Sequence, residues 1–333
     1  MNVMLKEIAI GPRVKPHHRD LPLRVGTRAS PLALAQTRGF LRLLSGFCPV
    51  LNGLEVFQEH AITTTGDAVQ DRRLADIGGK GLFSKEIHEA LLDRRIDFAV
   101  HSLKDLETEL PPGIVLACAL KREEARDVLL LGPSCGRPDP SHPYAALPRG
   151  ATIGSSSVRR QAQLLHARPD LRVEPIRGNV QTRLAKLRAG ECDASLLALA
   201  GLRRLGLEVP NAIVLEPEIM VPAAAQGIVG VTARADDTEL LDLLAAIEDP
   251  EARAVSTAER SMLAELDGSC RTPIGGYARV LADGRLMLTG MVARADGSFL
   301  ETRSLTARMS DADRLGQTLG TALRADAPVD LFD

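Results

Sequence analysis

The chain has 333 residues, a net charge of −2 and 45% hydrophobic residues, which indicates a globular protein of two or three domains rather than one core. Aromatic residues make up only 3% and Trp is absent, so base-stacking surfaces are not expected, and the small net charge does not favour nucleic acid or an anionic membrane as a partner. No apolar run approaches the roughly 20 residues that a membrane span requires.

The first 20 residues, MNVMLKEIAIGPRVKPHHRD, have neither a sustained apolar core nor a small-residue cleavage site. A signal peptide would need both of these features. We interpret this stretch as a flexible N-terminal extension. We therefore expect a cytoplasmic protein.

The next elements alternate between strand and helix. LRV at residues 23–25 predicts a short strand, and Ser30 followed by proline predicts the start of a helix. A second helix is predicted at about 82–94, with Phe83 on its apolar face. DFAV at 97–100 predicts a buried strand that runs directly into HSLKDLE.

The alternation continues between residues 151 and 204, which predicts α/β layers with largely parallel sheets. LLDRRIDFAVHS and KLRAGECDASLLA share a pattern of basic helix end, Asp and apolar strand, which indicates two similar lobes. The segment VPAAAQGIVGV at 221–231 is predicted to return the chain from the second lobe to the first. From about residue 251, a helix, a Gly/Pro turn and strands joined by DG turns predict a small α+β unit.

Basic residues concentrate between residues 151 and 204, where the local charge is +6. Many of these cations are explained by solvated helix faces. Arg159 and Arg160 differ because they lie in the first turn of a predicted helix, where the macrodipole disfavours cations. Together with Ser156 and Ser157, they would form a strong anion site.

Further cations follow other predicted strand ends. Arg28 and Ser30 lie at one strand–helix junction, Arg177 and Arg183 flank another, and Lys80 lies in a GGKG loop that lacks Walker A spacing. Loops at the strand ends of an α/β sheet face one crevice. The predicted ligand is a polycarboxylate or a phosphorylated small molecule, because guanidinium groups suit these anions.

The sequence has two further candidate functional positions. Lys104 and Asp105 directly follow a buried strand, where a carboxylate can serve a cation or a polarised N–H, although a loop or capping Asp is the alternative. Cys270 lies in the turn DGSCRTPIGG. From the residues alone it is a nucleophile, a metal ligand, half of a disulfide, a covalent anchor or an inert thiol. Five cysteines without a CxxC pair do not favour a zinc site or a disulfide framework.

Many separate segments together resemble the hydroxymethylbilane synthase (porphobilinogen deaminase) family. The resemblance covers residues 21 to 280 and includes RVGTRASPLALAQ, TTTGD, DIGGKGLFSKEI, DFAVHSLKDLE, IGSSSVRRQAQL, IRGNVQTRLAKL, ALAGLRRLGL, VPAAAQGIVG and GSCRTPIGGYA. It implies an α/β fold of three domains, two of them like the lobes of type II periplasmic binding proteins. The implied divisions are an extension at 1–20, lobe 1 at 21–122 and 227–247, lobe 2 at 123–226, and an α+β domain at 248–333.

The resemblance implies a transferase of tetrapyrrole (haem or chlorophyll) biosynthesis. Such an enzyme condenses four porphobilinogen molecules head to tail, with loss of ammonia, onto a dipyrromethane cofactor, and then releases hydroxymethylbilane by hydrolysis. The cofactor would be attached to Cys270 through a thioether. The resemblance implies a monomer without a metal site, a nucleic-acid partner or a membrane partner.

The resemblance also assigns roles to matching positions. Asp105 would be catalytic, holding pyrrole N–H groups and stabilising a cationic ring, with Lys104 and Arg28 beside it. Lys80 would belong to a cleft loop and Gln226 to the segment between the lobes. Residues that would bind cofactor and substrate, besides Cys270, are Ser30, Lys104, Asp105, Ser156, Ser157, Arg159, Arg160, Arg177, Arg183 and Arg204.

Two departures from the family pattern bear on these roles. Asp76 stands where some members have a second Lys before the GGKG lysine, which makes this loop less basic. KDLETELPPG differs from the KDVP-type version, which predicts an altered loop shape with Asp105 retained. Two alternatives remain from the residues: a non-catalytic, two-lobed anion-binding protein, which gives no role to Cys270 or Asp105, and a nucleic-acid-binding protein, which explains only the local charge.

Overall fold

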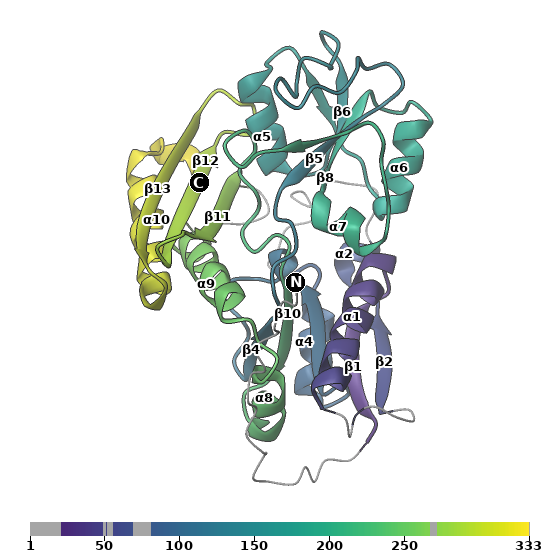
Figure 1. Cartoon of the computed structure of the whole chain (residues 1–333), viewed down its shortest axis with the longest axis vertical. Helices are drawn as coiled ribbons and strands as arrows, with labels where there is room; N and C mark the ends of the chain where they lie inside the picture. Colours follow the sequence, from purple (N-terminus) through teal and green to yellow (C-terminus); the bar gives the residue numbers. More distant parts are fainter. Residues whose placement is uncertain (1–20, 49–50, 52–55, 69–80, 267–271, 333) are drawn as a thin grey trace, which may run out of the picture.

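The computed structural model describes residues 21–48, 51, 56–68, 81–266 and 272–332. These residues form two α/β lobes and a smaller C-terminal domain, which lies to one side of both lobes in Figure 1. The predicted N-terminal extension, Asp76, Lys80 and Cys270 lie outside the described residues. In the part of the chain that is described, no helix is long and apolar enough to cross a membrane.

Lobe 1 is built on a five-stranded sheet of order β2-β1-β3-β10-β4. Its strands are β1 (Leu23–Arg28), β2 (Phe57–Ile62), β3 (Phe98–Ser102), β4 (Ile114–Ala119) and β10 (Val229–Arg234). Its helices are α1 (Pro31–Phe47), α2 (Thr65–Ala68), α4 (Lys85–Leu92) and α8 (Thr238–Ala245). Phe40 of α1 packs edge-on against Phe98 of β3 with ring centroids 5.6 Å apart, which joins this helix to the sheet.

Lobe 2 is built on a second five-stranded sheet, of order β7-β6-β8-β5-β9. Its strands are β5 (Asp127–Leu131), β6 (Thr152–Gly154), β7 (Arg172–Glu174), β8 (Ala194–Ala198) and β9 (Ala212–Leu215). Its helices are α5 (Val158–Ala167), α6 (Val180–Arg188) and α7 (Leu199–Arg204). Strands β5 and β8 are almost wholly buried, as expected for apolar strands at the centre of a layered fold.

The two sheets have the same topology, which supports the prediction of two similar lobes. Replacing β1, β2, β3, β10 and β4 by β6, β7, β8, β5 and β9 converts one strand order into the other. The equivalent aspartates Asp97 and Asp193 even make the same contact. Each accepts a hydrogen bond of 2.7 Å from a backbone amide of the neighbouring strand, from Arg24 and Thr152 respectively.

The prediction of largely parallel sheets holds for four of the five strands in each lobe, but one strand of each sheet runs in the opposite direction. In lobe 1, β10 runs antiparallel to β3 and β4, and in lobe 2, β5 runs antiparallel to β8 and β9. Each of these strands is the first element after the chain crosses from the other lobe. The chain therefore enters β10 and β5 at the end of the sheet that faces the other lobe. The other strands of each sheet run in the opposite direction.

The two crossing segments lie side by side. The amide of Glu123 donates to the carbonyl of Gly227 at 3.0 Å. Gly227 has φ +90°, and a Cβ there would lie 2.3 Å from the Glu123 carbonyl oxygen, so this approach requires glycine. The lobe boundaries predicted near these residues remain predictions.

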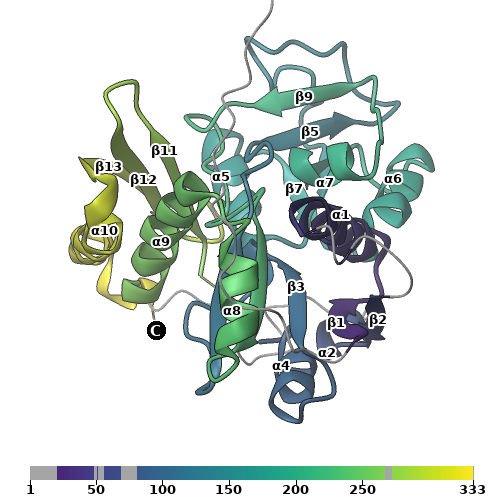
Figure 2. The same cartoon turned by 60° about the horizontal axis from the view of Figure 1, so that its bottom comes forward.

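The C-terminal domain contains the predicted antiparallel strands. Its sheet has the order β11-β12-β13, formed by Ile274–Val280, Arg285–Ala293 and Leu300–Arg308, and it packs on α9 (Pro250–Glu265) and α10 (Ala312–Asp326). Figure 2 shows α9 beside the lobes and α10 farther out. Glu259 of α9 is fully buried and pairs with Arg122 at 2.6 Å, which ties this domain to the first crossing segment.

The helix predicted at 82–94 is shorter, because α4 begins at Lys85. Phe83 therefore lies in the preceding turn rather than on the helix. Its ring faces Arg28, whose guanidinium carbon is 4.0 Å from the ring centroid. A Cβ on Gly66 would lie 2.3 Å from this ring, so the absence of a side chain there makes room for the phenyl group.

Candidate functional site

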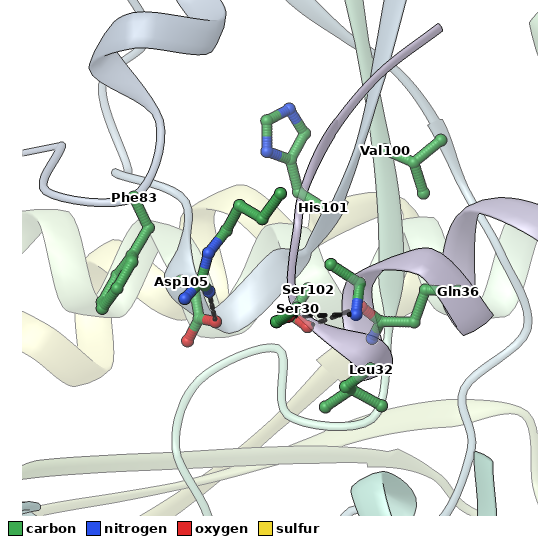
Figure 3. A pocket seen from close by; sticks show the side chains of 10 residues that line it. Ser30, Leu32, Gln36, Phe83, Val100, His101, Ser102 and Asp105 are labelled. Carbon is green, nitrogen blue, oxygen red and sulfur yellow. Dashed lines mark hydrogen bonds and ion pairs between the residues drawn. The ribbon is translucent and has the colours of Figure 1, made fainter. Parts of the chain in front are cut away.

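A hollow opens where β1 and β3 end in lobe 1. Its walls come from both strands, from the start of α1 and from the turn before α4 (Figure 3). The lining residues are Arg28, Ser30, Leu32, Ala33, Gln36, Phe83, Val100, His101, Ser102 and Asp105. Three predicted site residues, Arg28, Ser30 and Asp105, therefore share one hollow.

Arg28 is held from several sides at the end of β1. Its Nε donates to Asp67 at 3.0 Å, a second nitrogen bonds the other Asp67 oxygen, and Phe83 covers the guanidinium. Burial alone would lower the pKa of Arg28, but Asp67 and Asp105 outweigh burial and raise it. The guanidinium is therefore a fixed positive charge beside Asp105.

Asp105 ends a short 3₁₀ turn, Leu103–Asp105, that directly follows β3. Its Oδ2 lies 3.5 Å from Nη1 of Arg28, and its side chain keeps 32% of its surface exposed. Leu103 is fully buried and anchors the turn in the core. The buried strand thus positions a partly open carboxylate at the rim of the hollow, as the sequence predicts.

Lys104 points to the junction of the lobes. Its Nζ donates to Oε1 of Gln226 at 3.3 Å. The pKa of Lys104 is lowered to about 8, first by desolvation and then by the positive charges of Arg160 and Arg159. The residue itself keeps exposed surface, so this desolvation comes from protein around the ammonium and not from complete enclosure.

Gln226 links the two lobes. The residue is fully buried, and its amide nitrogen donates to the Ala125 carbonyl at 2.6 Å and to Oδ1 of Asp127 at 2.9 Å. Its oxygen accepts from Lys104. One side chain of the returning segment therefore joins Lys104 of lobe 1 to Asp127 of lobe 2.

Arg159 and Arg160 are buried and share one carboxylate, Asp127. Each guanidinium lies 2.7 Å from an Asp127 oxygen, and they also donate to the carbonyls of Val221 and Leu196. Burial would raise the pKa of Asp127, but the two arginines outweigh burial and hold that pKa well below its usual range. Two cations facing one anion leave the cluster positive.

The predicted serines are mainly structural in this conformation. Ser30 caps α1 by accepting from Ala33 at 3.3 Å, and Ser157 caps α5 by accepting from Arg160 at 3.4 Å. Ser156 donates to the Ile176 carbonyl at 2.8 Å. The capping prediction for Ser30 is confirmed, the cap at Ser157 was not predicted, and the role of these hydroxyl groups in ligand binding stays a prediction.

Three further predicted site residues, Arg177, Arg183 and Arg204, are arginines of lobe 2. Arg177 donates to the Gly66 carbonyl of lobe 1 at 3.4 Å, and Arg183 donates to the Gly178 carbonyl at 3.0 Å. Desolvation, with the charges of Arg160 and Arg177, lowers the pKa of Arg183 to about 10. Arg204 instead donates to the Gly227 carbonyl at 2.7 Å and contacts the returning segment.

Sequence reasoning missed the acidic partners of these cations. Asp67, Asp127 and Glu107 each face a basic group, yet none lies beside it in the sequence. The only signal available was Asp127 at the start of a buried apolar strand, where an unpaired carboxylate would be costly. Among the described residues, no cluster of three or more His, Cys, Asp or Glu could hold a metal ion.

The fold and the site define a two-lobed α/β protein with several cations near the junction of the lobes and one partly open carboxylate at the edge of lobe 1. The model of the porphobilinogen deaminase dipyrromethane cofactor-binding domain matches residues 23–242, and the model of the porphobilinogen deaminase C-terminal domain matches residues 252–325. The chain belongs to the porphobilinogen deaminase family. The predicted family is thereby confirmed.

Similar proteins from bacteria and from a plant carry the same family name. The chain is 47% identical to porphobilinogen deaminase of Paracoccus denitrificans over 94% of its own length and 96% of the relative. It is 48% identical to that of Nitrobacter winogradskyi, with the same coverage of both chains. It is 43% identical to the chloroplastic protein of Oryza sativa over 93% of this chain and 86% of the relative.

Solved structures with a similar arrangement include the substrate-binding protein of an amino acid ABC transporter. That match has 13% identity and a TM-score of 0.36, and it covers 73% of this chain and 97% of the other. Similarity at this level supports no argument about function.

Proposed function

We propose that this chain is a hydroxymethylbilane synthase, a transferase that joins four porphobilinogen molecules head to tail with loss of ammonia and releases the linear tetrapyrrole by hydrolysis. The observation that carries this proposal is the position of Asp105, a partly open carboxylate beside Arg28 in a hollow at the strand ends. Membership of the family supports it. Monomeric state and cytoplasmic location stay predictions.

A dipyrromethane cofactor and its growing product would carry many negative charges, because each pyrrole bears an acetate and a propionate. Arg177 of lobe 2 donates to a lobe 1 carbonyl, and Lys104 of lobe 1 donates to the segment that links the lobes, so both cations lie near the junction of the lobes. Guanidinium and ammonium groups there would attract a ligand that bears several carboxylates. When bound, the dipyrromethane supplies the free pyrrole carbon at which chain growth begins.

Asp105 would act on the substrate ring. Loss of ammonia leaves positive charge on a pyrrole, and a preorganised carboxylate stabilises such charge most where water is limited. Arg28 holds Asp105 from one side without covering it, because their closest atoms are 3.5 Å apart and one third of the Asp105 side chain stays exposed. The carboxylate can therefore accept pyrrole N–H groups.

Arg159 and Arg160 would act differently from Arg177, Arg183 and Lys104. Their direct ligand in this conformation is Asp127, so they would contribute a residual positive charge to the crevice wall. Direct contact with a ligand carboxylate would require one guanidinium to leave Asp127. This distinction qualifies the cofactor-binding role that was predicted for both residues.

The intact mass of the purified protein tests the proposal. We expect the wild-type chain to be heavier than its sequence by two linked pyrrole units and the Cys270→Ser variant to match its sequence. Bare masses for both proteins, even after incubation with porphobilinogen, would contradict the proposal. That outcome would leave a two-lobed anion-binding protein as the better description.

A further inference from the structure

The segment that follows Asp105 is tied to helix α4 by a buried polar cluster, which we define as Ser84, His88 and Glu107. Oε2 of Glu107 accepts a hydrogen bond of 2.5 Å from Oγ of Ser84. Its other oxygen lies 3.2 Å from Nδ1 of His88, at ion-pair distance rather than in hydrogen-bond alignment. Glu107 keeps 12% of its side-chain surface exposed and His88 keeps 3%.

This cluster lies next to the hollow and not within it. His88 packs beside His101, with ring centroids 6.1 Å apart, and His101 lines the hollow together with Arg28 and Asp105. Ser84 directly follows Phe83, the residue that covers Arg28. The cluster therefore joins the turn that holds Arg28 to the segment that holds Asp105.

A second set of contacts clamps the same segment from the C-terminal domain. Arg260 of α9 donates to the carbonyls of Leu106, Glu107 and Thr108 at 3.1, 2.7 and 3.1 Å. Backbone immediately after Asp105 is thus held by two elements that lie far away in the sequence. Arg260 fixes this backbone from the C-terminal domain, and the Glu107 side chain fixes it from lobe 1.

The lowered pKa of Glu107 and the close packing around its side chain both indicate a carboxylate that is held in one position. Burial would raise the pKa of Glu107, but the contacts with His88 and Ser84 outweigh burial and lower it to about 2. Gly81, with φ +78°, approaches so closely that a Cβ there would lie 3.2 Å from Glu107 and 3.3 Å from Ser84. A tightly enclosed, ionised group is suited to holding backbone in place.

We propose that Glu107 is a positioning residue for Asp105, acting through Ser84 and His88 to fix the distance between Asp105 and Arg28. Glu107 lies within KDLETELPPG, the stretch whose departure from the KDVP-type pattern predicts an altered loop. The structure gives that departure a physical consequence, a side-chain anchor for the catalytic turn. The inference rests on the proposed function, because it assigns Asp105 to the reaction.

The test compares Glu107→Gln, which keeps the shape and removes the charge, with Glu109→Gln as its matched control. Glu109 is exposed and lies two residues farther along the same segment. We expect Glu107→Gln to lower kcat for porphobilinogen roughly tenfold with little change in KM, since small misplacement of a catalytic group affects the chemical step most. Glu109→Gln should stay within about twofold of wild type.

Hydrogen exchange provides a readout that does not depend on turnover. The amide of Leu106 donates to the Leu103 carbonyl at 3.2 Å and closes the 3₁₀ turn of Asp105. Amides of residues 103–108 should exchange faster in Glu107→Gln than in wild type, while those of lobe 2 stay unchanged. Ser84→Ala should act in the same direction, and adding it to Glu107→Gln should cost little more, because both remove one interaction.

Unchanged kcat and unchanged exchange at 103–108 in Glu107→Gln would overturn the inference. A loss of kcat with faster exchange throughout the chain would also overturn it, because that result describes general destabilisation. If the wild-type protein consumed no porphobilinogen, the proposed function would fail. The exchange comparison would then still decide whether Glu107 fixes the turn.

Discussion

The two lobes share one strand order but hold their cations in opposite ways. In lobe 1, Arg28 lies at the rim of a hollow beside a carboxylate that stays partly open. In lobe 2, Arg159 and Arg160 lie at the equivalent strand–helix junction but are buried against Asp127. The same topology therefore supplies a partly exposed carboxylate at the edge of one lobe and a buried, positively charged cluster in the other.

The difference follows from the position of each acidic partner. Asp105 follows the end of β3, beyond the sheet, where solvent and ligand can reach it. Asp127 begins β5, which lies between β8 and β9 in its sheet, and is fully buried. A carboxylate at a strand end can exchange partners, whereas one inside a sheet is held by the need to pair buried charge.

The largest expected effect comes from removing the open carboxylate. Asp105→Ala should lower turnover of porphobilinogen by roughly 100-fold or more, because electrostatic stabilisation at the reacting ring is lost. The thermal unfolding midpoint should stay close to wild type, since the carboxylate is partly exposed. The exposed Asp93 serves as control, and Asp93→Ala should retain activity. Near-normal tetrapyrrole production by Asp105→Ala would remove that residue from the catalytic role.

Removing the buried carboxylate of Asp127 should lower the stability of the fold. Asp127→Ala leaves two buried guanidinium groups without their partner, which costs about 3–5 kcal/mol in the free energy of unfolding. Urea denaturation measures this change. Asp93→Ala breaks an exposed pair with Arg95 and should cost less than about 1 kcal/mol. Equal costs in the two variants would contradict the contrast between buried and exposed pairs.

A smaller effect should appear in pH dependence, through the cation that joins the lobes. The pKa of Lys104 is lowered from 10.5 to about 8, so its charge is lost as pH rises through about 8. Affinity for carboxylate-bearing pyrroles should fall over that range. Between about pH 8 and pH 10.5, Lys104 binds more protons in the unfolded chain than in the folded chain. The contribution of Lys104 to the free energy of unfolding therefore rises with pH over this range.

Titration of ligand affinity in wild type and in Lys104→Arg measures this effect. The arginine should keep its charge and move the loss of affinity to higher pH. The same alkaline limb in both proteins would show that another group is responsible.

Much of the fold was predictable from local pattern. Apolar runs identified the buried strands, the capping residue Ser30 identified the start of α1, and alternation with DG turns identified the C-terminal sheet. The parallel-sheet prediction missed one reversed strand in each lobe, because the direction of β5 and β10 depends on how the chain crosses between the lobes. That crossing is a property of the whole chain, which no local window contains.

For the site, the sequence by itself determined which groups are available. Asp105 after a buried strand, the cations at strand ends and the resemblance to the family are all readable from residue order. Only the tertiary structure decided which of these charges remain exposed, because the acidic partners Asp67 and Asp127 come from other elements. Ion pairing depends on distances of a few ångströms between distant segments, and folding alone sets those distances.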